Sequence, residues 1–408
     1  MSKLLTSDNN EFLSNMVAKC NETLLKAKAP VCFATISKSR QSGEPMNVDS
    51  IEASLRNGGR ISRADAESLW KNASDEQLRM LANIVRDRYH APKTATYLLM
   101  RIINYTNVCV ALCDYCSFYR LPKSPEGYVR SKEWIFAKID ELLEVGGDLF
   151  GFNGGFNPEL KIDYYVDLFG SIREKYGDSL EFYAMTVVEL LYIARVSKIS
   201  VPEALSRLKQ AGVRWITGGG AEILADSFRK RHSPQKYTVA EYMDTQQKII
   251  EAGLSTTATM VIGFDESLDE RLDHLETVRN FQDATNGGLF SFLCWTYKPY
   301  NNELGGKEIG ADEYLRHLAL CRIFLDNVRH LRTSVLTQNA NALKGLSYGA
   351  NDFDVPWEDE VTQMAGAVIE RDVERILGYA AAEGFSTTYR HVAREPRQVS
   401  APHVVSIR

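Results

Sequence analysis

The alternation of short apolar runs with longer amphipathic stretches, which begins near Thr96, constrains the fold of this chain more than any other feature. Short apolar runs bounded by turn residues indicate buried strands, and the longer stretches between them indicate helices. Repeated β–α units of this kind build parallel sheets, because each helix carries the chain across to the next strand. The pattern therefore predicts an α/β protein with a full or nearly full (β/α)8 TIM-type barrel.

The individual elements follow from the same periodicities. We expect strands at Tyr97–Ile103, Leu149–Phe152, Glu181–Met185, Trp215–Ile216, Thr257–Ile262, Leu289–Leu293 and Ser334–Leu336, with a candidate eighth at Leu346–Tyr348. We expect helices between them at Lys132–Glu144, Ile162–Lys175, Val201–Ala211, Val239–Ala252, Glu266–Gln282 and Ala311–Val328.

Four segments are expected along the chain: an appended segment over residues 1–50, a helical layer over 51–95, the barrel over 96–350, and a C-terminal extension and tail over 351–408. The first segment has one helical pattern at Glu11–Lys28 and one strand-like piece at Val31–Ile36. We expect the helical layer to form a lid or a base layer of the barrel.

Serine residues are the expected N-caps of two helices in the helical layer. The C-terminal tail contains proline residues. The layer contains Ile51–Arg56, Arg63–Lys71 after Ser62, and Asp75–His90 after Ser74. The extension contains a helix over Asp359–Ala382 and a tail over Glu395–Arg408.

Composition excludes several classes of protein. With 408 residues, 44% of them hydrophobic, the chain can bury a large core. A net charge of −5 argues against nucleic acid as the main partner, since nucleic-acid-binding surfaces are usually strongly basic. No run of about 18 apolar residues is present, so we expect no membrane span. Seven cysteines and no apolar leader at Met1 predict a reducing compartment, the cytoplasm.

Three cysteines, Cys109, Cys113 and Cys116, lie together in the loop after the first predicted strand. Three thiolates from one short loop suit a [4Fe–4S] cluster in which each thiolate binds one iron and the fourth iron is open to a ligand. The alternative is a zinc site, which usually needs four ligands. The nearest histidines are His90 and His232, so the loop itself offers no fourth ligand.

The run Asn104–Arg120, NYTNVCVALCDYCSFYR, resembles the cluster loop of the radical S-adenosylmethionine enzymes. The resemblance implies that the cofactor's methionine part binds the open iron and that Tyr115, before the last cysteine, lies near the adenine. Over approximately residues 60–390 the chain resembles the futalosine cyclases of the menaquinone pathway. The run Gly218–Leu224, GGGAEIL, matches that group.

Further cofactor-binding residues follow from the resemblance at the ends of later strands. Asn153, Gly154 and Gly155 come after the second strand, where bare backbone allows close approach to a ligand. An ordinary turn is the alternative. Thr186 and Glu189, after the third strand, are candidates for cofactor contact, but their spacing also fits a capping box with no ligand.

The fourth strand is followed by Glu222, a candidate for binding hydroxyl groups, and by Arg229, whose planar fork suits a carboxylate. A solvated basic turn is the alternative reading of the cations here: Arg229, Lys230, Arg231 and Lys236.

Candidate substrate-binding residues lie further along the chain. Trp295 can wall an aromatic substrate, and Lys298 can pair with its carboxylate. Asn302 ends the same stretch, and Arg271 lies on the helix after the fifth strand. Three groups are candidate catalytic bases: Glu222, His274 and Asp352.

The chain departs from the cyclase pattern at positions expected to face the substrate. It has Tyr297 and Tyr300 where the cyclases carry a proline-rich loop containing Gln, and Ser334-Val335 where they carry Ser-Trp. Asp354 follows Gly349–Phe353, where the cyclases carry Gly.

The resemblance implies an enzyme that uses a [4Fe–4S] cluster and S-adenosylmethionine to abstract hydrogen from a small, aromatic, carboxylated substrate and to cyclise it. A reductase, flavodoxin or ferredoxin would supply the electron. Two alternatives stay open. One is a related radical enzyme resembling aminofutalosine synthase or the deazaflavin-forming enzymes, and the other is a non-catalytic zinc-binding module.

Overall fold

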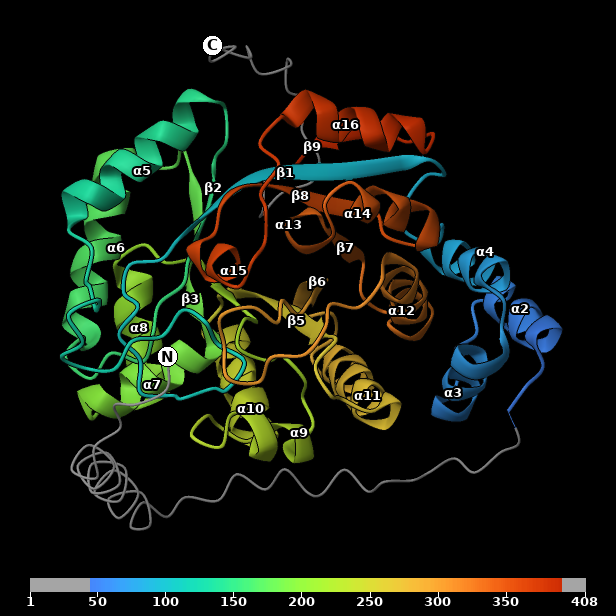
Figure 1. Ribbon diagram of the computed structural model, residues 1–408, viewed down its shortest axis with the longest axis horizontal. Helices are drawn as coiled ribbons and strands as arrows, with labels where there is room; N and C mark the ends of the chain where they lie inside the picture. Colours follow the sequence, from blue (N-terminus) through green and yellow to red (C-terminus); the bar gives the residue numbers. More distant parts are fainter. Residues whose placement is uncertain (1–44, 391–408) are drawn as a thin grey trace. The chain divides into compact units, whose positions relative to one another are not determined.

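The computed structural model describes residues 45–390 (Figure 1). Eight parallel strands form a closed barrel, because β1 pairs with β8 on one side and with β2 on the other. The expected (β/α)8 architecture is confirmed. The strands are β1 (Thr94–Ile103), β2 (Leu149–Phe152), β3 (Glu181–Thr186), β4 (Trp215–Thr217), β5 (Ser255–Ile262), β6 (Leu289–Thr296), β7 (His330–Ser334) and β8 (Asp352–Glu358).

Helices surround the barrel between successive strands (Figure 1). Six match the predicted ones closely: α5 (Lys132–Glu144), α6 (Ile162–Tyr176), α8 (Val201–Gln210), α10 (Val239–Glu251), α11 (Leu268–Ala284) and α12 (Ala311–Phe324). Ser131, Ser200, Thr238 and Ser267 cap four of them by accepting a hydrogen bond from a first-turn N–H. Two helices after β3 and β4 were not expected: α7 (Val187–Ser197) and α9 (Asp226–His232).

The N-terminal helices form a layer on the side of the barrel. They are α2 (Val48–Arg56), α3 (Arg63–Asn72) and α4 (Asp75–Arg86). Ser62 and Ser74 form the capping boxes of α3 and α4, as the sequence predicts. Because α3 and α4 pack against α11 and α12, the layer covers the outside of the helical ring, and its expected place as a lid or base is wrong.

The predicted positions of the last two strands are wrong. Ser334–Leu336 is not a strand, because β7 ends at Ser334 and Val335 begins the short helix α13 (Val335–Gln338). Leu346–Tyr348 lies in the 3-10 helix η1 (Gly345–Tyr348), which follows α14 (Asn341–Lys344). The true strands carry charged residues toward the barrel interior, so neither reads as an apolar run.

The segment after β8 also differs from the expected single helix over Asp359–Ala382. It contains α15 (Glu360–Met364), α16 (Val373–Ala382) and a ninth strand, β9 (Ser386–Tyr389). Strand β9 pairs in parallel with the start of β1, whereas β2 pairs with the end of β1, so β9 extends the barrel wall below β2. The patterns predicted at Glu11–Lys28, Val31–Ile36 and Glu395–Arg408 lie outside the described residues.

The barrel interior has an apolar lower layer, formed by Leu98, Met100, Leu149, Tyr183 and Trp215. Alternate residues of the parallel strands point into such a barrel, so a few side chains from each strand form the interior above this layer. Within residues 45–390, no helix is long and apolar enough to cross a membrane.

Candidate active site

A cavity of about 320 Å³ lies at the carboxyl ends of the barrel strands and reaches down between them. All eight strands or the loops after them contribute to its lining, as expected for a barrel of this type. The three cysteines Cys109, Cys113 and Cys116 line one part of it, so the structure brings all three thiols to the same space.

Backbone hydrogen bonds hold the cysteine loop in place. Cys109 N donates to Arg120 O at 2.9 Å, and Arg120 N donates to Asn107 O at 2.8 Å, which closes the base of the loop. The Asn107 side chain continues this closure by accepting from Tyr128 N at 2.8 Å. At the tip, Cys116 N donates to Cys113 O at 3.1 Å. The positions of the thiols are therefore set by the protein fold.

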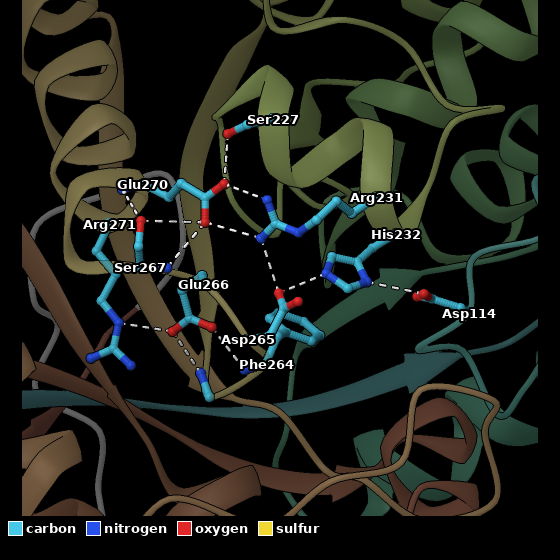
Figure 2. A network of polar contacts seen from close by, with 11 residues as sticks. Asp114, Ser227, Arg231, His232, Phe264, Asp265, Glu266, Ser267, Glu270 and Arg271 are labelled. Carbon is cyan, nitrogen blue, oxygen red and sulfur yellow. Dashed lines mark hydrogen bonds and ion pairs between the residues drawn. The ribbon is translucent and has the colours of Figure 1, made fainter.

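A polar network fixes the same loop from the outside (Figure 2). His232, the last residue of α9, lies between two carboxylates: its Nδ1 is 3.0 Å from Asp114 Oδ2 and its Nε2 is 2.7 Å from Asp265 Oδ1. Arg231 binds Asp265 and Glu270, and its hydrogen bonds lower the pKa of Glu270 to about 2. Asp114 lies between Cys113 and Cys116, so this network links the cluster loop to the loop after β5.

Burial sets the protonation of the thiols. It raises the pKa of Cys109 to about 11 and that of Cys113 to about 12, while the nearby Lys236 ammonium opposes the shift at both. Burial also raises the pKa of Cys116. The thiols are thus protonated at neutral pH in the absence of metal, and binding of iron must displace their protons.

The glycine run after β2 packs directly on the cysteine loop. A Cβ on Gly155 would lie 2.2 Å from Val108 O and 2.7 Å from Cys109 Cβ, so no side chain fits there. Gly154 N donates to Glu189 Oε1 at 2.8 Å, and Asn153 lines the cavity beside it. All three residues named from the sequence lie at the cavity, and Gly155 is required by the packing of the loop.

Thr186 and Glu189 form the capping box of α7, which confirms the structural reading of their spacing. Glu189 Oε2 accepts from Thr186 N and Oγ1, at 2.9 and 2.6 Å, and Oε1 accepts from Tyr105 Oη at 2.6 Å as well as from Gly154 N. Both residues also line the cavity. Because both Glu189 oxygens are used, its main role is to join α7 to the loop after β2.

The glycine run after β4 leads to Glu222, which lines the cavity. Gly220 has φ +82°, and a Cβ there would lie 2.2 Å from a Val188 methyl group. Glu222 Oε1 accepts from Lys236 Nζ at 3.1 Å, whereas Oε2 is buried with no hydrogen-bond partner among the described residues. Lys236 Nζ also lies 3.1 Å from Tyr115 Oη. These three side chains form a polar row beside the cysteines.

Lys236 is the main residue of this site that the sequence reading missed. Burial opposes its charge, but Cys113, Glu222 and Tyr115 outweigh that effect and raise its pKa. Its place in a run of cations suggested a solvated basic turn. That reading is wrong for Lys236 and for Arg229, which are both buried, while Lys230 is exposed.

Arg229 and His274 do not line the cavity. The Arg229 guanidinium donates from Nε to Tyr237 O at 2.6 Å and from Nη1 to Ala221 O at 3.0 Å, so it supports the loop after β4. His274 Nδ1 accepts from Leu224 N at 2.9 Å, and burial lowers its pKa to about 3. The prediction of His274 as a base is therefore corrected: it is a neutral ring that ties α11 to the same loop.

Three other predicted site residues also lie elsewhere. Arg271 pairs with Glu266 and Glu313, and Asn302 Oδ1 accepts from Tyr297 Oη at 2.7 Å; neither residue lines the cavity. Asp352 is buried at the lower end of the barrel, at the start of β8, and does not line the cavity either.

The upper wall of the cavity comes from the loop after β6 and from α15. Trp295, Tyr297 and Lys298 line it, in agreement with the expected aromatic wall, and Lys298 pairs with Glu308. Asn301 Nδ2 donates to Met364 O at 2.8 Å, which links this loop to α15. Tyr300 is half exposed and does not line the cavity.

Two sequence models of known families match the chain. The model of the Radical SAM superfamily matches residues 103–278, and that of the CofH/MqnC C-terminal region matches residues 286–403. The chain is 37% identical over 335 residues to cyclic dehypoxanthine futalosine synthase of Halalkalibacterium halodurans, covering 81% of this chain and 90% of that protein. The chain belongs to the radical S-adenosylmethionine superfamily.

Other similarities agree with this placement. Aminodeoxyfutalosine synthase of Thermus thermophilus is 30% identical over 340 residues, covering 80% of this radical S-adenosylmethionine protein and 90% of the relative. Among solved structures, the FeFe-hydrogenase maturase HydG from Carboxydothermus hydrogenoformans superposes with a TM-score of 0.65 over 94% of this chain and 84% of its own, at 15% identity. That similarity supports the barrel fold alone.

The superfamily uses a [4Fe–4S] cluster with S-adenosylmethionine, and the residues present fit both groups. Three thiols line one cavity, and Gly155 leaves room only for bare backbone beside Cys109. Glu222 presents a buried oxygen with no partner next to Lys236. The zinc-binding alternative is wrong, because the cysteine spacing belongs to the matched superfamily.

Proposed function

We propose that this radical S-adenosylmethionine enzyme cyclises dehypoxanthine futalosine in menaquinone biosynthesis. The similarity to the Halalkalibacterium halodurans synthase, over 90% of that protein, is the observation that carries the proposal. When bound, the cluster and S-adenosylmethionine would supply a 5′-deoxyadenosyl radical for hydrogen abstraction from the substrate's sugar and ring closure onto the benzoate, and the cluster would take back the electron left when a base removes the proton.

The protein's own residues would hold the two cofactors in the upper part of the cavity. Cys109, Cys113 and Cys116 would bind the cluster. Tyr115, Asn153, Gly154 and Gly155 would flank S-adenosylmethionine, with Thr186, Glu189 and Glu222 beside them, since all seven line the same cavity. Within residues 45–390 Glu222 Oε2 has no hydrogen-bond partner, so it could accept a hydrogen bond from the cofactor or take a proton from the substrate.

Of the three bases predicted from the sequence, only Glu222 lines the cavity, and we assign proton removal to it. Lys236 Nζ lies 3.1 Å from Glu222 Oε1 and holds the carboxylate in position beside the cysteines. Both side chains are largely shielded from solvent, which limits the access of water to the reacting atoms.

The substrate would occupy the space between the cysteine loop and the β6 side of the barrel. Trp295 would pack against its aromatic ring, and Lys298 would lie near its carboxylate at the upper wall. Because Lys298 is paired with Glu308, the substrate's carboxylate would compete with Glu308 for it.

A flavodoxin, a ferredoxin or a reductase would deliver the electron, and the reaction would take place in the cytoplasm, where cluster thiols remain reduced.

The test is anaerobic reconstitution followed by incubation with S-adenosylmethionine, a reductant and dehypoxanthine futalosine. We expect 5′-deoxyadenosine to rise with the substrate, together with a cyclised product that has two hydrogen atoms fewer than the substrate, because one leaves as a hydrogen atom and one as a proton. A product that retains the adenosyl carbons would instead show that the enzyme forms an adduct, as enzymes of the aminofutalosine synthase type do. Slow cleavage of S-adenosylmethionine without a cyclised product would overturn the assignment of dehypoxanthine futalosine as the substrate.

A further inference from the structure

Two charged side chains from neighbouring strands meet inside the barrel, below the cysteines. Arg332 of β7 and Asp354 of β8 both line the cavity and are only 3% and 4% exposed. Arg332 Nη2 lies 3.2 Å from Asp354 Oδ1, and Arg332 Nε lies 3.6 Å from Asp352 Oδ2. The pair is thus held at the lower end of the space in which the substrate would lie.

The polar atoms of this pair are not satisfied by the protein. Arg332 Nε, Arg332 Nη2 and Asp354 Oδ1 are buried, and none of them has a hydrogen-bond partner among residues 45–390. The contact between Nη2 and Oδ1 is close enough for an ion pair but lacks the geometry of a hydrogen bond. Buried polar atoms in native proteins are nearly always paired, so three such atoms on two residues that line the same cavity indicate a ligand group.

The charges around the pair indicate which group that is. Arg332 and Arg390 balance Asp352 and Asp354, so this part of the barrel has no net charge to attract an acid or a base. A substrate carboxylate placed here would face Asp354. A hydroxyl group fits better, because it can donate to a carboxylate oxygen and accept from a guanidinium N–H.

We propose that Arg332 and Asp354 form a subsite that binds a hydroxyl group of the substrate's sugar. The inference rests on the proposed function and deepens it, because it orients the sugar at the lower end of the cavity with the ring toward Trp295. The carboxylate of Asp354 accepts from the hydroxyl group, and the Arg332 guanidinium donates to the hydroxyl oxygen.

The experiment compares dehypoxanthine futalosine with an analogue that lacks the sugar hydroxyl groups, in the reconstituted enzyme. We expect the wild-type protein to prefer the natural substrate by about 10- to 100-fold in kcat/KM, since a hydrogen bond to a charged group is lost with the analogue. Asp354→Ala should lose most of this preference, and Asp354→Asn should raise KM about 10-fold with a much smaller effect on kcat.

Asp326→Asn is the control, because Asp326 is buried and accepts from Arg60 Nε but does not line the cavity. This variant should keep the wild-type preference. If Asp354→Ala folds poorly, Arg332→Lys tests the same subsite and should also reduce the preference. A wild-type enzyme that forms no cyclised product overturns the proposed function. An active wild type whose preference survives in the Asp354 variants overturns the subsite alone.

Discussion

Asp352 and Asp354 lie two residues apart on β8, and both point into the barrel, but their environments are opposite. Asp352 accepts from Thr96 Oγ1 at 2.6 Å and from both Nε and Nη2 of Arg390. Burial raises its pKa, but the charges of Arg390 and Arg332 outweigh burial and lower it. Asp354 Oδ1 has no hydrogen-bond partner among the described residues, and burial raises the pKa of this carboxyl group. Burial therefore does not decide the state of a carboxyl group; its partners do.

The same contrast separates the lower end of the barrel from the cavity. At the lower end, Arg390, the residue after β9, completes the partners of Asp352. In the cavity, Glu222 and Asp354 each keep one oxygen that has no hydrogen-bond partner within residues 45–390. Asp352, with hydrogen bonds to both oxygens, holds the lower end of the fold together, whereas each of the two cavity carboxylates can still accept a hydrogen bond from a ligand.

The largest expected effect is the loss of cluster binding when a cysteine of the cavity is replaced. Cys113→Ala removes one of three thiolates, so cluster binding and S-adenosylmethionine cleavage should both be abolished, as measured by iron content, visible absorbance and 5′-deoxyadenosine. Cys294→Ala is the control, because Cys294 is buried on β6 outside the cavity lining and should leave the cluster intact. Unchanged cluster absorbance in Cys113→Ala would contradict the site.

The second largest expected effect is a loss of stability when Asp352, at the lower end of the barrel, is replaced. Asp352→Ala leaves Arg390 buried without its anion, so the free energy of unfolding in urea should fall by about 3–5 kcal/mol. The double variant Asp352→Ala/Arg390→Met should recover part of this loss, because the uncompensated charge is gone. A single variant as stable as the wild type would show that the pair does not hold this end of the barrel.

A smaller effect on activity is expected at Lys236. Lys236→Met keeps the apolar stem but removes the ammonium group that contacts Glu222 and Tyr115. We expect kcat/KM for substrate-dependent cleavage to fall by about 10- to 100-fold with the fold retained. Lys230→Met, on the exposed side of the same segment, should have wild-type kinetics. Equal activity of the two variants would count against a role for Lys236.

The smallest effect should be a pH dependence of stability. Asp359 lines the cavity, and burial raises its pKa to about 6. The native state then holds a proton that the unfolded state releases near pH 4, so stability falls as the pH rises from about 4 to 6. Asp359→Asn should therefore gain about 1–3 kcal/mol relative to the wild type on going from pH 4 to pH 8.

The opposite sign is expected at Asp352, whose pKa the charges of Arg390 and Arg332 lower in spite of burial. Asp352→Asn should lose stability relative to the wild type as the pH rises to about 4, because the native carboxylate is ionised at pH values where the unfolded one still binds a proton, and above about pH 5 the difference should stay constant. Chemical denaturation at about pH 3, 4 and 8 measures both variants, and the same pH dependence in both would contradict the contrast between the two ends of the barrel.

Local patterns predicted much of this molecule. The capping boxes at Ser62 and Ser74, six barrel helices and the first six strands follow from spacing within one segment. The end of the barrel was misplaced because β7 and β8 turn charged side chains inward, and a strand with Arg332 or Asp354 facing the interior has no apolar run to detect.

The sequence by itself determined the cysteine triad, the glycines that pack on it and the barrel class, because each depends on residues close together in the chain. Only the tertiary structure decided which charged residues reach the cavity. Lys236 and Arg332 do, whereas His274, Arg271 and Asp352 do not. The reason is that pairing between distant residues, such as Asp352 with Arg390 or Glu222 with Lys236, depends on how the strands and loops close around the barrel, and no local spacing records it.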